Sequence, residues 1–266
     1  MDINGSTILV TGASGGIGRA IAVDLAERGA KVLAVARGKD KLRVLADEVA
    51  GIRPMPCDVT SAADRQRLFA DAGAIDVVVN NAGSSWIGAF LDMSSDEVAD
   101  QIALNFTSMT AMCAAAMPAM LERNSGHIVN IGSTLGFAPG PPLTVYSATK
   151  AAVHAFTVGL RREVVGTNVR VTLIAPGPVK GTAALDQAGD EGATATVERA
   201  FEAIGADPED VATAVRRSLE TDAKPSNRTI TVPRIAGLSR AAAIPGADWA
   251  MDHAFGLLRK AGVKIS

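Results

Sequence analysis

Short β-branched runs alternate along this chain with longer segments of helical periodicity, and this alternation limits the folds available to it. Apolar residues recur at helical spacing within 16–28 and 39–49, between runs that are each long enough for one strand. The runs are nearly continuous in apolar residues, so both faces of the sheet must be covered, and helical crossovers make the strands parallel. We therefore predict an α/β fold, a doubly wound sheet of seven parallel strands flanked by helices, with strands at 7–11, 31–36, 52–55, 75–80, 126–132, 169–175 and 229–233.

The bulk composition is that of one domain with a large core. A chain of 266 residues with 48% hydrophobic content needs no second domain, and we predict a single domain over 1–266. The formal net charge of -2 leaves no basic footprint for nucleic acid. The amino-terminal residues carry no export signal, and no apolar run approaches the roughly 20 residues of a membrane span. We expect a cytoplasmic protein with no membrane span and no nucleic-acid partner, acting on a small molecule.

The spacing of cysteine and histidine does not indicate a metal site. Cys57 and Cys113 are the two cysteines, and the histidines form no ligand pattern with them. We expect reduced thiols and no bound metal.

A glycine-rich turn joins the first predicted strand to the first predicted helix. Gly12 allows a tight turn, Gly16 lets the backbone approach a pyrophosphate, and Gly18 allows the helix to pack closely on the strand. Free N–H groups at the helix start face the anion in such turns. An ordinary glycine-rich loop is the alternative, and the motif by itself does not decide. The candidate dinucleotide-binding residues of this turn are Gly12, Ser14, Gly15, Gly16, Ile17 and Gly18.

The end of the second predicted strand indicates the type of dinucleotide. Enzymes that prefer NAD usually place a carboxylate there for the ribose 2′-hydroxyl, whereas this chain has Ala36. Arg37 follows, and its planar guanidinium suits a 2′-phosphate, with Lys39 close behind. An arginine after a strand can also be a solvated residue without a ligand. The missing carboxylate favours NADP over NAD.

Two further strand ends carry candidate cofactor contacts. Asp58 and Val59 follow the third strand, where a short acidic side chain would accept from the adenine amino group or cap the next helix. Asn81, Ala82 and Gly83 follow the fourth strand, and their small size lets the backbone approach the adenosine ribose. The alternative for these three residues is a plain turn.

Tyr146 and Lys150 stand four residues apart in a predicted helix, so both side chains lie on one face. A nearby ammonium favours the phenolate and moves the tyrosine pKa, near about 10 when free, toward neutrality. Such a pair also occurs by chance on exposed helices. Ser133 supports the functional interpretation because it follows an apolar strand at the edge where ligands bind, so its hydroxyl would bind a substrate oxygen. We predict that Tyr146 is a general acid/base.

Together these residues carry a family resemblance. The glycine turn, Asn81-Ala82-Gly83, Ser133, the Tyr146 to Lys150 pair and Pro176-Gly177 resemble the classical short-chain dehydrogenases/reductases, over nearly the whole chain. The resemblance implies a single-domain Rossmann-type fold and an oxidoreductase that acts on CH-OH or C=O groups.

The resemblance also implies a role for each matched residue. Tyr146 exchanges a proton with the substrate oxygen, Ser133 hydrogen-bonds that oxygen, and Lys150 also binds the nicotinamide ribose. Asn105 corresponds to the family's helix asparagine, which holds a water linking the lysine to solvent, although an asparagine in a helix also suits local backbone binding. The candidates beside the nicotinamide are Pro176, Gly177, Val179 and Thr182.

Some features depart from the family pattern. Gly132 replaces a serine that often precedes the catalytic one, which we expect only to loosen the turn, and Gly15 stands where many NADP-preferring members have a basic residue. The tail at about 234–266 resembles that of relatives whose carboxyl segment packs over the substrate mouth. We also expect a substrate-covering segment at about 178–200. The family also implies a homodimer or homotetramer, through faces that include Met109, Met112, Ala115, Ala152, Ala155 and Val158.

The expected substrate is a hydrophobic ketone, aldehyde or secondary alcohol. The predicted wall of the substrate pocket is apolar and consists of Trp86, Ile87, Phe90, Leu135, Phe137, Pro139 and Leu143. Each of these residues could equally belong to the ordinary core. A catalytically silent dinucleotide-binding sensor or scaffold of the same fold is the main alternative. Epimerases and dehydratases of related fold are a third option, ranked last because they usually need a longer substrate region.

Overall fold

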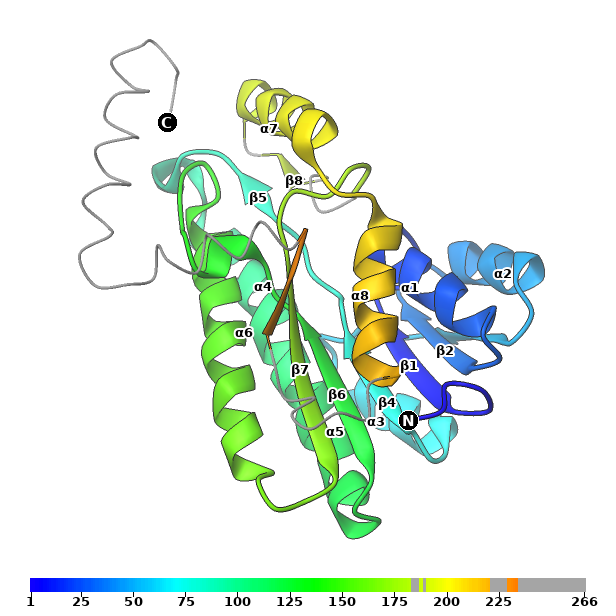
Figure 1. The fold of residues 1–266 in the computed structure, drawn as a ribbon. Helices are drawn as coiled ribbons and strands as arrows, with labels where there is room; N and C mark the ends of the chain where they lie inside the picture. Colours follow the sequence, from blue (N-terminus) through cyan, green and yellow to red (C-terminus); the bar gives the residue numbers. More distant parts are fainter. Residues whose placement is uncertain (183–186, 189, 221–228, 234–266) are drawn as a thin grey trace.

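The computed structural model describes residues 1–182, 187–188, 190–220 and 229–233 (Figure 1). Its centre is a parallel sheet of seven strands in the order β3-β2-β1-β4-β6-β7-β9, which confirms the predicted fold class. The bounds agree with the predicted strands to within two residues: β1 Thr7–Thr11, β2 Lys31–Ala36, β3 Ile52–Pro56, β4 Val77–Asn80, β6 Gly126–Ile131, β7 Val169–Pro176 and β9 Thr229–Val232.

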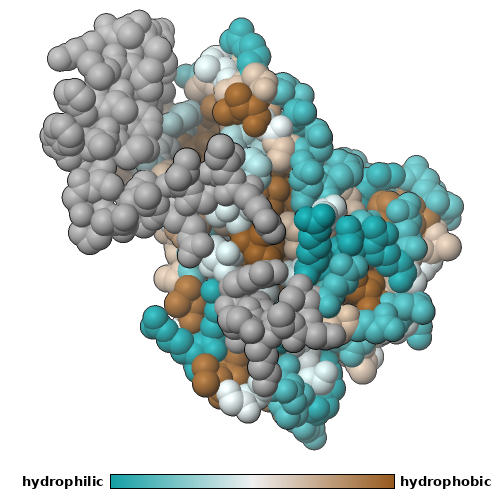
Figure 2. All heavy atoms as spheres, viewed as in Figure 1, coloured by the Kyte–Doolittle hydropathy of each residue, from teal (hydrophilic) through white to brown (hydrophobic). Residues whose placement is uncertain are grey.

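Helices cover both faces of the sheet. On one face, the apolar sides of α1 (Gly16–Ala26), α2 (Lys39–Glu48) and α8 (Pro208–Glu220) share a core with the strands. On the other face, α3 (Ala62–Ala72) and the long helices α5 (Ser108–Glu122) and α6 (Thr144–Glu163) form a second core. In the view of Figure 2, the outer surface on the side of α1, α2 and α8 is mainly hydrophilic. Burial of apolar residues against both faces is what makes the strands apolar throughout.

The chain changes direction between β1 and β4, and this change positions the site. From β1 the strands run outward to β2 and β3, and the chain then returns to place β4 on the other side of β1. The connection after β1 therefore leaves toward β2 and the connection after β4 leaves in the opposite direction, toward β6. This divergence opens a crevice beyond the carboxyl ends of β1 and β4.

One helical run in the described residues is longer than the sequence suggested. Helix α4 (Ser95–Ile102), a π turn (Ala103–Thr107) and α5 are continuous through Pro118, and the 28 residues of Ser95–Glu122 are long and apolar enough to cross a membrane by length and composition. The sequence has no uninterrupted apolar run of this length, but the continuous helix that contains its longest apolar stretch reaches it. A single such helix is weak evidence for a membrane, because core helices pass the same test. Here Met112, Cys113 and Met120 are buried against the sheet, and 39% of the apolar window is buried inside the protein.

Burial also corrects part of the predicted subunit-contact surface. Met109 and Met112 lie inside the second core, so they are not available to another subunit. Ala115 and Ala155 are exposed, while Ala152 and Val158 are half-buried. The helical period turns the methionines toward the sheet and the alanines outward.

Two short strands and a helix lie above the carboxyl edge of the sheet. Strands β5 (Trp86–Ile87) and β8 (Gln187–Ala188) pair in parallel, and α7 (Glu191–Ile204) follows (Figure 1). The predicted substrate-covering segment, about 178–200, includes β8 and the first part of α7, and its residues 183–186 and 189 lie outside the described part. The predicted tail at 234–266 lies wholly outside the described residues.

Candidate functional site

A cavity of about 970 Å³ opens along the carboxyl edge of the sheet and collects most of the predicted site residues. Ser133, Tyr146 and Lys150 line it, while Asn105 is buried beneath. Gly18 is absent from its wall. The predicted cofactor residues that line it are Gly12, Ser14, Gly15, Gly16, Ile17, Arg37, Asp58, Val59, Asn81, Ala82, Gly83, Tyr146, Lys150, Pro176, Gly177, Val179 and Thr182.

At two positions of the β1–α1 turn, neighbouring atoms lie so close that only glycine fits. Gly12 has φ +69°, and a Cβ there would lie 2.8 Å from Asn81 Nδ2. A Cβ on Gly18 would lie 2.1 Å from the Gly12 carbonyl oxygen, so any side chain would push α1 away from β1. Gly18 therefore permits the close packing of α1 on the end of β1 without lining the cavity, whereas Gly12, Gly15 and Gly16 line it.

The β4 turn is tied to the end of β1 by hydrogen bonds. The amides of Asn81 and Ala82 both donate to Thr11 Oγ1, at 2.9 and 3.0 Å, and Asn81 Nδ2 donates to the Thr11 carbonyl at 3.0 Å. The Asn81 carboxamide is thus engaged with the backbone of β1. Its contribution to the cavity is to hold the two strand ends together.

The β2 end of the cavity is basic. Arg37 lines it as predicted, but the second cation on the wall is Lys41 rather than Lys39. Helix α2 begins at Lys39, so Lys41 belongs to its first turn, and side chains of a helix lean toward its amino terminus. The sequence signal that was missed is a basic residue in the first turn of the helix that follows Arg37.

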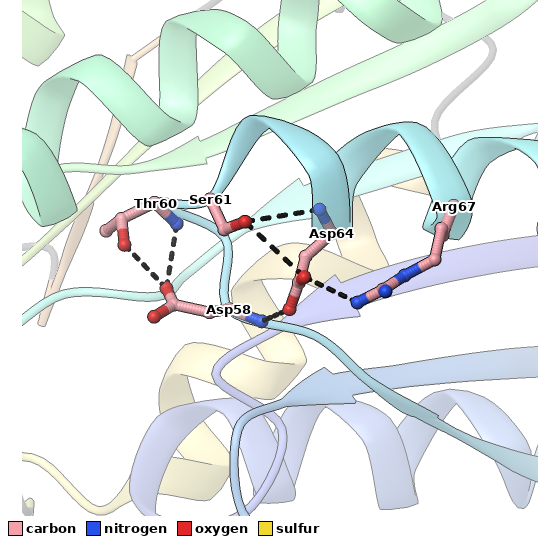
Figure 3. A network of polar contacts seen from close by, with 5 residues as sticks. All are labelled: Asp58, Thr60, Ser61, Asp64 and Arg67. Atoms are coloured by element: carbon pink, nitrogen blue, oxygen red, sulfur yellow. Dashed lines mark hydrogen bonds and ion pairs between the residues drawn. The ribbon is translucent and has the colours of Figure 1, made fainter.

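Asp58 forms a turn of its own and does not cap helix α3. Its Oδ1 accepts from the Thr60 amide and hydroxyl, at 2.9 and 2.7 Å, while the helix cap is Ser61, whose Oγ accepts from the Asp64 amide (Figure 3). The Asp58 amide in turn donates to Asp64 Oδ2 at 3.0 Å. The Thr60 hydrogen bonds lower the pKa of Asp58, so it is a carboxylate. Of the two predicted roles, helix capping is wrong, and the acceptor role stays a prediction.

Tyr146 and Lys150 lie on one face of α6, as their spacing predicts. Lys150 Nζ lies 5.6 Å from the centroid of the Tyr146 ring. It donates to the carbonyl of Ile131, the last residue of β6, at 3.0 Å. This bond fixes the ammonium between the helix and the sheet.

The electrostatics of this pair differ from the sequence expectation. Burial raises the pKa of Tyr146, and the hydrogen bond with Ser133 opposes this rise only in part. Burial also lowers the pKa of Lys150 to about 8. The expected shift of the phenol toward neutrality is therefore wrong, since the loss of water outweighs the lowering by the Ser133 hydrogen bond. Tyr146 is held as a neutral phenol, which is the proton-donating form.

Asn105 lies in the π turn and is anchored to the loop after β4. Its Oδ1 accepts from the Ser84 amide and its Nδ2 donates to the Ser84 carbonyl, both at 2.8 Å. Nδ2 also reaches Thr149 Oγ1 at 3.1 Å, on α6. The partner backbone is distant in sequence, so local backbone binding does not describe this residue. π turns are often found at functional sites.

Comparison with known proteins places this geometry in a family. The short chain dehydrogenase family model matches residues 6–192. The chain belongs to the classical short-chain dehydrogenase/reductase family. An uncharacterised oxidoreductase of Staphylococcus aureus (strain N315) is 43% identical over 177 residues, which are 64% of this chain and 77% of that protein.

Solved structures of this family resemble the chain along most of its length. A closed form of serine dehydrogenase complexed with NADP⁺ is 35% identical with a TM-score of 0.77, covering 85% of this chain and 93% of that one. A 3-oxoacyl-[acyl-carrier protein] reductase from Brucella melitensis with bound NAD is 28% identical, with a TM-score of 0.77 and coverages of 87% and 90%. The chain is thus an oxidoreductase of a family whose members bind NADP or NAD.

The end of the cavity beside Ser133 and Tyr146 has a different wall from the one predicted for the substrate. Leu135 and Leu143 line it as expected, and Val197 and Phe201 of α7 complete it. Their four-residue spacing on one helix face was a usable sequence signal. The remaining predicted wall residues do not line the cavity: Trp86, Ile87, Phe90, Phe137 and Pro139.

These five residues have other environments, and Pro139 is exposed. Trp86 and Ile87 are buried, and Trp86 Nε1 donates to Glu97 Oε1 at 3.1 Å. Phe90 is 55% exposed, and Phe137 packs on His154 with ring centroids 4.2 Å apart. Hydrophobicity alone did not separate core from cavity wall.

Proposed function

We propose that this protein is an NADP-dependent oxidoreductase that transfers a hydride between the nicotinamide and a hydrophobic ketone, aldehyde or secondary alcohol. The observation that supports this most is that one cavity contains both Arg37 and Lys41 at the β2 end and Ser133, Tyr146 and Lys150 at the β6 end. A dinucleotide is long enough to join two such ends, and the glycine turn lies between them.

The described residues fit a 2′-phosphorylated dinucleotide. Gly12, Gly15 and Gly16 give the backbone access to a pyrophosphate, and Ala36 leaves no carboxylate at the end of β2. Arg37 and Lys41 then bind the 2′-phosphate, and we assign Pro176, Gly177, Val179 and Thr182 to the nicotinamide end. When bound, NADPH supplies the hydride.

The protein's own residues handle the proton. Tyr146, a neutral phenol, donates its proton to the substrate oxygen during reduction and takes it back during oxidation. Ser133 donates a hydrogen bond to the same oxygen. Lys150 binds the nicotinamide ribose and stabilises the phenolate left after proton transfer, because its ammonium faces the Tyr146 ring. Asn105 holds the Ser84 loop and Thr149 against this group.

The substrate end favours an uncharged, apolar compound. Leu135, Leu143, Val197 and Phe201 form its wall. In the described lining, the arginine and lysine side chains are Arg37, Lys41 and Lys150, all assigned to the cofactor or to the chemistry. An amino acid such as serine, the substrate in the name of one relative, would leave its carboxylate without a cation.

We further propose a cytoplasmic homodimer or homotetramer. The exposed alanines of α5 and α6, including Ala115 and Ala155, let two helices approach closely. Sedimentation equilibrium at micromolar concentration measures the mass, and a monomer would contradict this assignment.

Initial rates with NADPH and NADH, measured on a panel of aliphatic and aromatic ketones, aldehydes and serine, test the function. We expect faster reduction of apolar ketones with NADPH and no oxidation of serine by NADP⁺. Arg37→Asp should reverse the cofactor preference. Arg43→Asp is the matched control, since Arg43 is exposed on α2 and does not line the cavity. NADPH binding without turnover of any compound would favour a silent binder, and tighter binding of NADH would refute the cofactor assignment.

A further inference from the structure

A histidine occupies space opened by two glycines beside the catalytic serine. His154 is buried on α6, and a Cβ on Gly132 would lie 2.5 Å from its Nε2. A Cβ on Gly136 would lie 2.5 Å from its Cε1. The sequence suggested that Gly132 only loosens the turn. The structure shows that it also makes room for the His154 ring.

The ring is hydrogen-bonded to the end of β6. The backbone amide of Ser133 donates to His154 Nε2 at 3.4 Å. Just before it, the Ile131 carbonyl accepts from Lys150 Nζ at 3.0 Å. Tyr146, Lys150 and His154 are spaced by four residues and share one face of α6. The strand end that carries Ser133 is thus fastened to the catalytic helix at two points.

We infer that His154 is a positioning residue, which fixes the Ser133 hydroxyl relative to the Tyr146 hydroxyl by accepting the Ser133 backbone N–H. This inference rests on the proposed function in that both hydroxyls are assigned to one substrate oxygen. It requires Nε2 to be unprotonated, which places the proton of the neutral ring on Nδ1.

The position of the ring argues for more than space filling. Leu135 and Phe137, on the same turn as Ser133, show that apolar side chains suit this region, and Phe137 packs directly on the ring. Burying a polar ring where a leucine would fill the volume costs free energy unless its nitrogen is used. The nitrogen that is used contacts the residue with the catalytic hydroxyl.

Substitution with and without an acceptor tests the inference in turnover. His154→Leu should lower kcat by roughly 5- to 10-fold with little change in NADPH affinity, and His154→Gln should restore most of it, because Gln Oε1 reaches the place of Nε2. In a Ser133→Ala background, His154→Leu should cause no further loss, since no hydroxyl remains to be positioned. Additive losses, or equal kcat for the Gln and Leu variants, would overturn the inference.

His127→Leu is the matched control, because His127 is also a buried histidine, but its Nε2 contacts Thr172 Oγ1 at the other end of the sheet rather than the Ser133 backbone. It should lower the melting temperature without changing kcat. A common fall in kcat for His127→Leu and His154→Leu would mean a general structural effect and would contradict a positioning role.

The ring tautomer gives a readout that does not need turnover. Nitrogen-15 NMR of the three histidines, with His154 assigned from its loss in His154→Gln, should show a protonated Nδ1 and an unprotonated Nε2 at neutral pH. A proton on Nε2 would refute the inference even in an active enzyme. A second readout is hydrogen exchange of the Ser133 amide, which should be protected only when residue 154 is His or Gln. If the protein reduces no compound but shows this protection and the expected tautomer, the proposed function fails while the contact between His154 and Ser133 stands.

Discussion

The two edges of the central sheet each bury a base, and the two bases have different consequences. At the carboxyl edge, Lys150 lines the cavity and its pKa is lowered to about 8 by burial. At the amino edge, His127 is completely buried with its pKa lowered to about 3, and its Nε2 lies 2.8 Å from Thr172 Oγ1. Because Lys150 adjoins the cavity, it is accessible to a ligand, and we propose a role for it in the chemistry, whereas His127 adjoins no part of that cavity. At His127, burial of the base affects only the free energy of unfolding.

The largest effect should come from removing one oxygen at the carboxyl edge. Tyr146→Phe keeps the ring and its packing but loses the exchangeable proton, so we expect turnover to fall by at least about 100-fold. NADPH affinity and melting temperature should stay close to those of the native protein. Stopped-flow kinetics measures turnover, fluorescence titration measures NADPH affinity, and thermal unfolding gives the melting temperature. A native rate of turnover in this variant would refute the mechanism.

Lys150→Met should separate function from stability. NADPH binding and turnover should both fall, whereas the free energy of unfolding at pH 7 should rise by about 1–3 kcal/mol. The reason is that the unfolded lysine, with a pKa of 10.5, binds its proton more tightly than the folded one at about 8. This cost is complete below pH 8 and disappears as the pH rises toward 10.5.

Denaturant unfolding of both proteins across this range measures the difference. The gain of Lys150→Met over the native protein should shrink from pH 8 to pH 10.5. A difference that does not change with pH would contradict the lowered pKa.

The amino edge should show the opposite pattern. The His127 ring has a pKa of about 3 when folded and 6.5 when unfolded, so its burial costs nothing above pH 6.5 and costs more as the pH falls. At pH 5 the cost is about 2 kcal/mol. His127→Gln should keep a hydrogen bond to Thr172, retain native turnover and lose less stability between pH 7 and pH 5. Equal acid sensitivity of the two proteins would contradict this prediction.

The smallest effect concerns the phenol itself. Tyr146 is the one tyrosine in the chain, so an absorbance titration reports on it alone. Burial should place its pKa above the ordinary 10.0, and Ser133→Ala should raise that pKa further, because the Ser133 hydrogen bond lowers it. Circular dichroism at each pH checks that the fold persists. A lower pKa in Ser133→Ala would contradict the contact.

Much of the site could be predicted from the sequence because its parts are local. The turn at Gly12 to Gly18 and the spacing of Tyr146 and Lys150 each lie within one segment, where backbone geometry follows from residue type. Contacts between distant segments were missed. Lys41 and Phe201 reach the cavity only because α2 and α7 are placed there, and His154 meets Ser133 across 21 residues.

The sequence by itself determined the class of fold, the strands, the glycine-rich turn after the first strand and the placement of Tyr146 and Lys150 on one helix face, since periodicity and short motifs encode them. Only the tertiary structure decided which apolar residues form the core and which the cavity wall, and in which direction burial shifts the pKa values of Tyr146 and Lys150. It also showed why residue 132 is a glycine. The physical reason is the same in each case: packing distance and exclusion of water depend on neighbours from other parts of the chain.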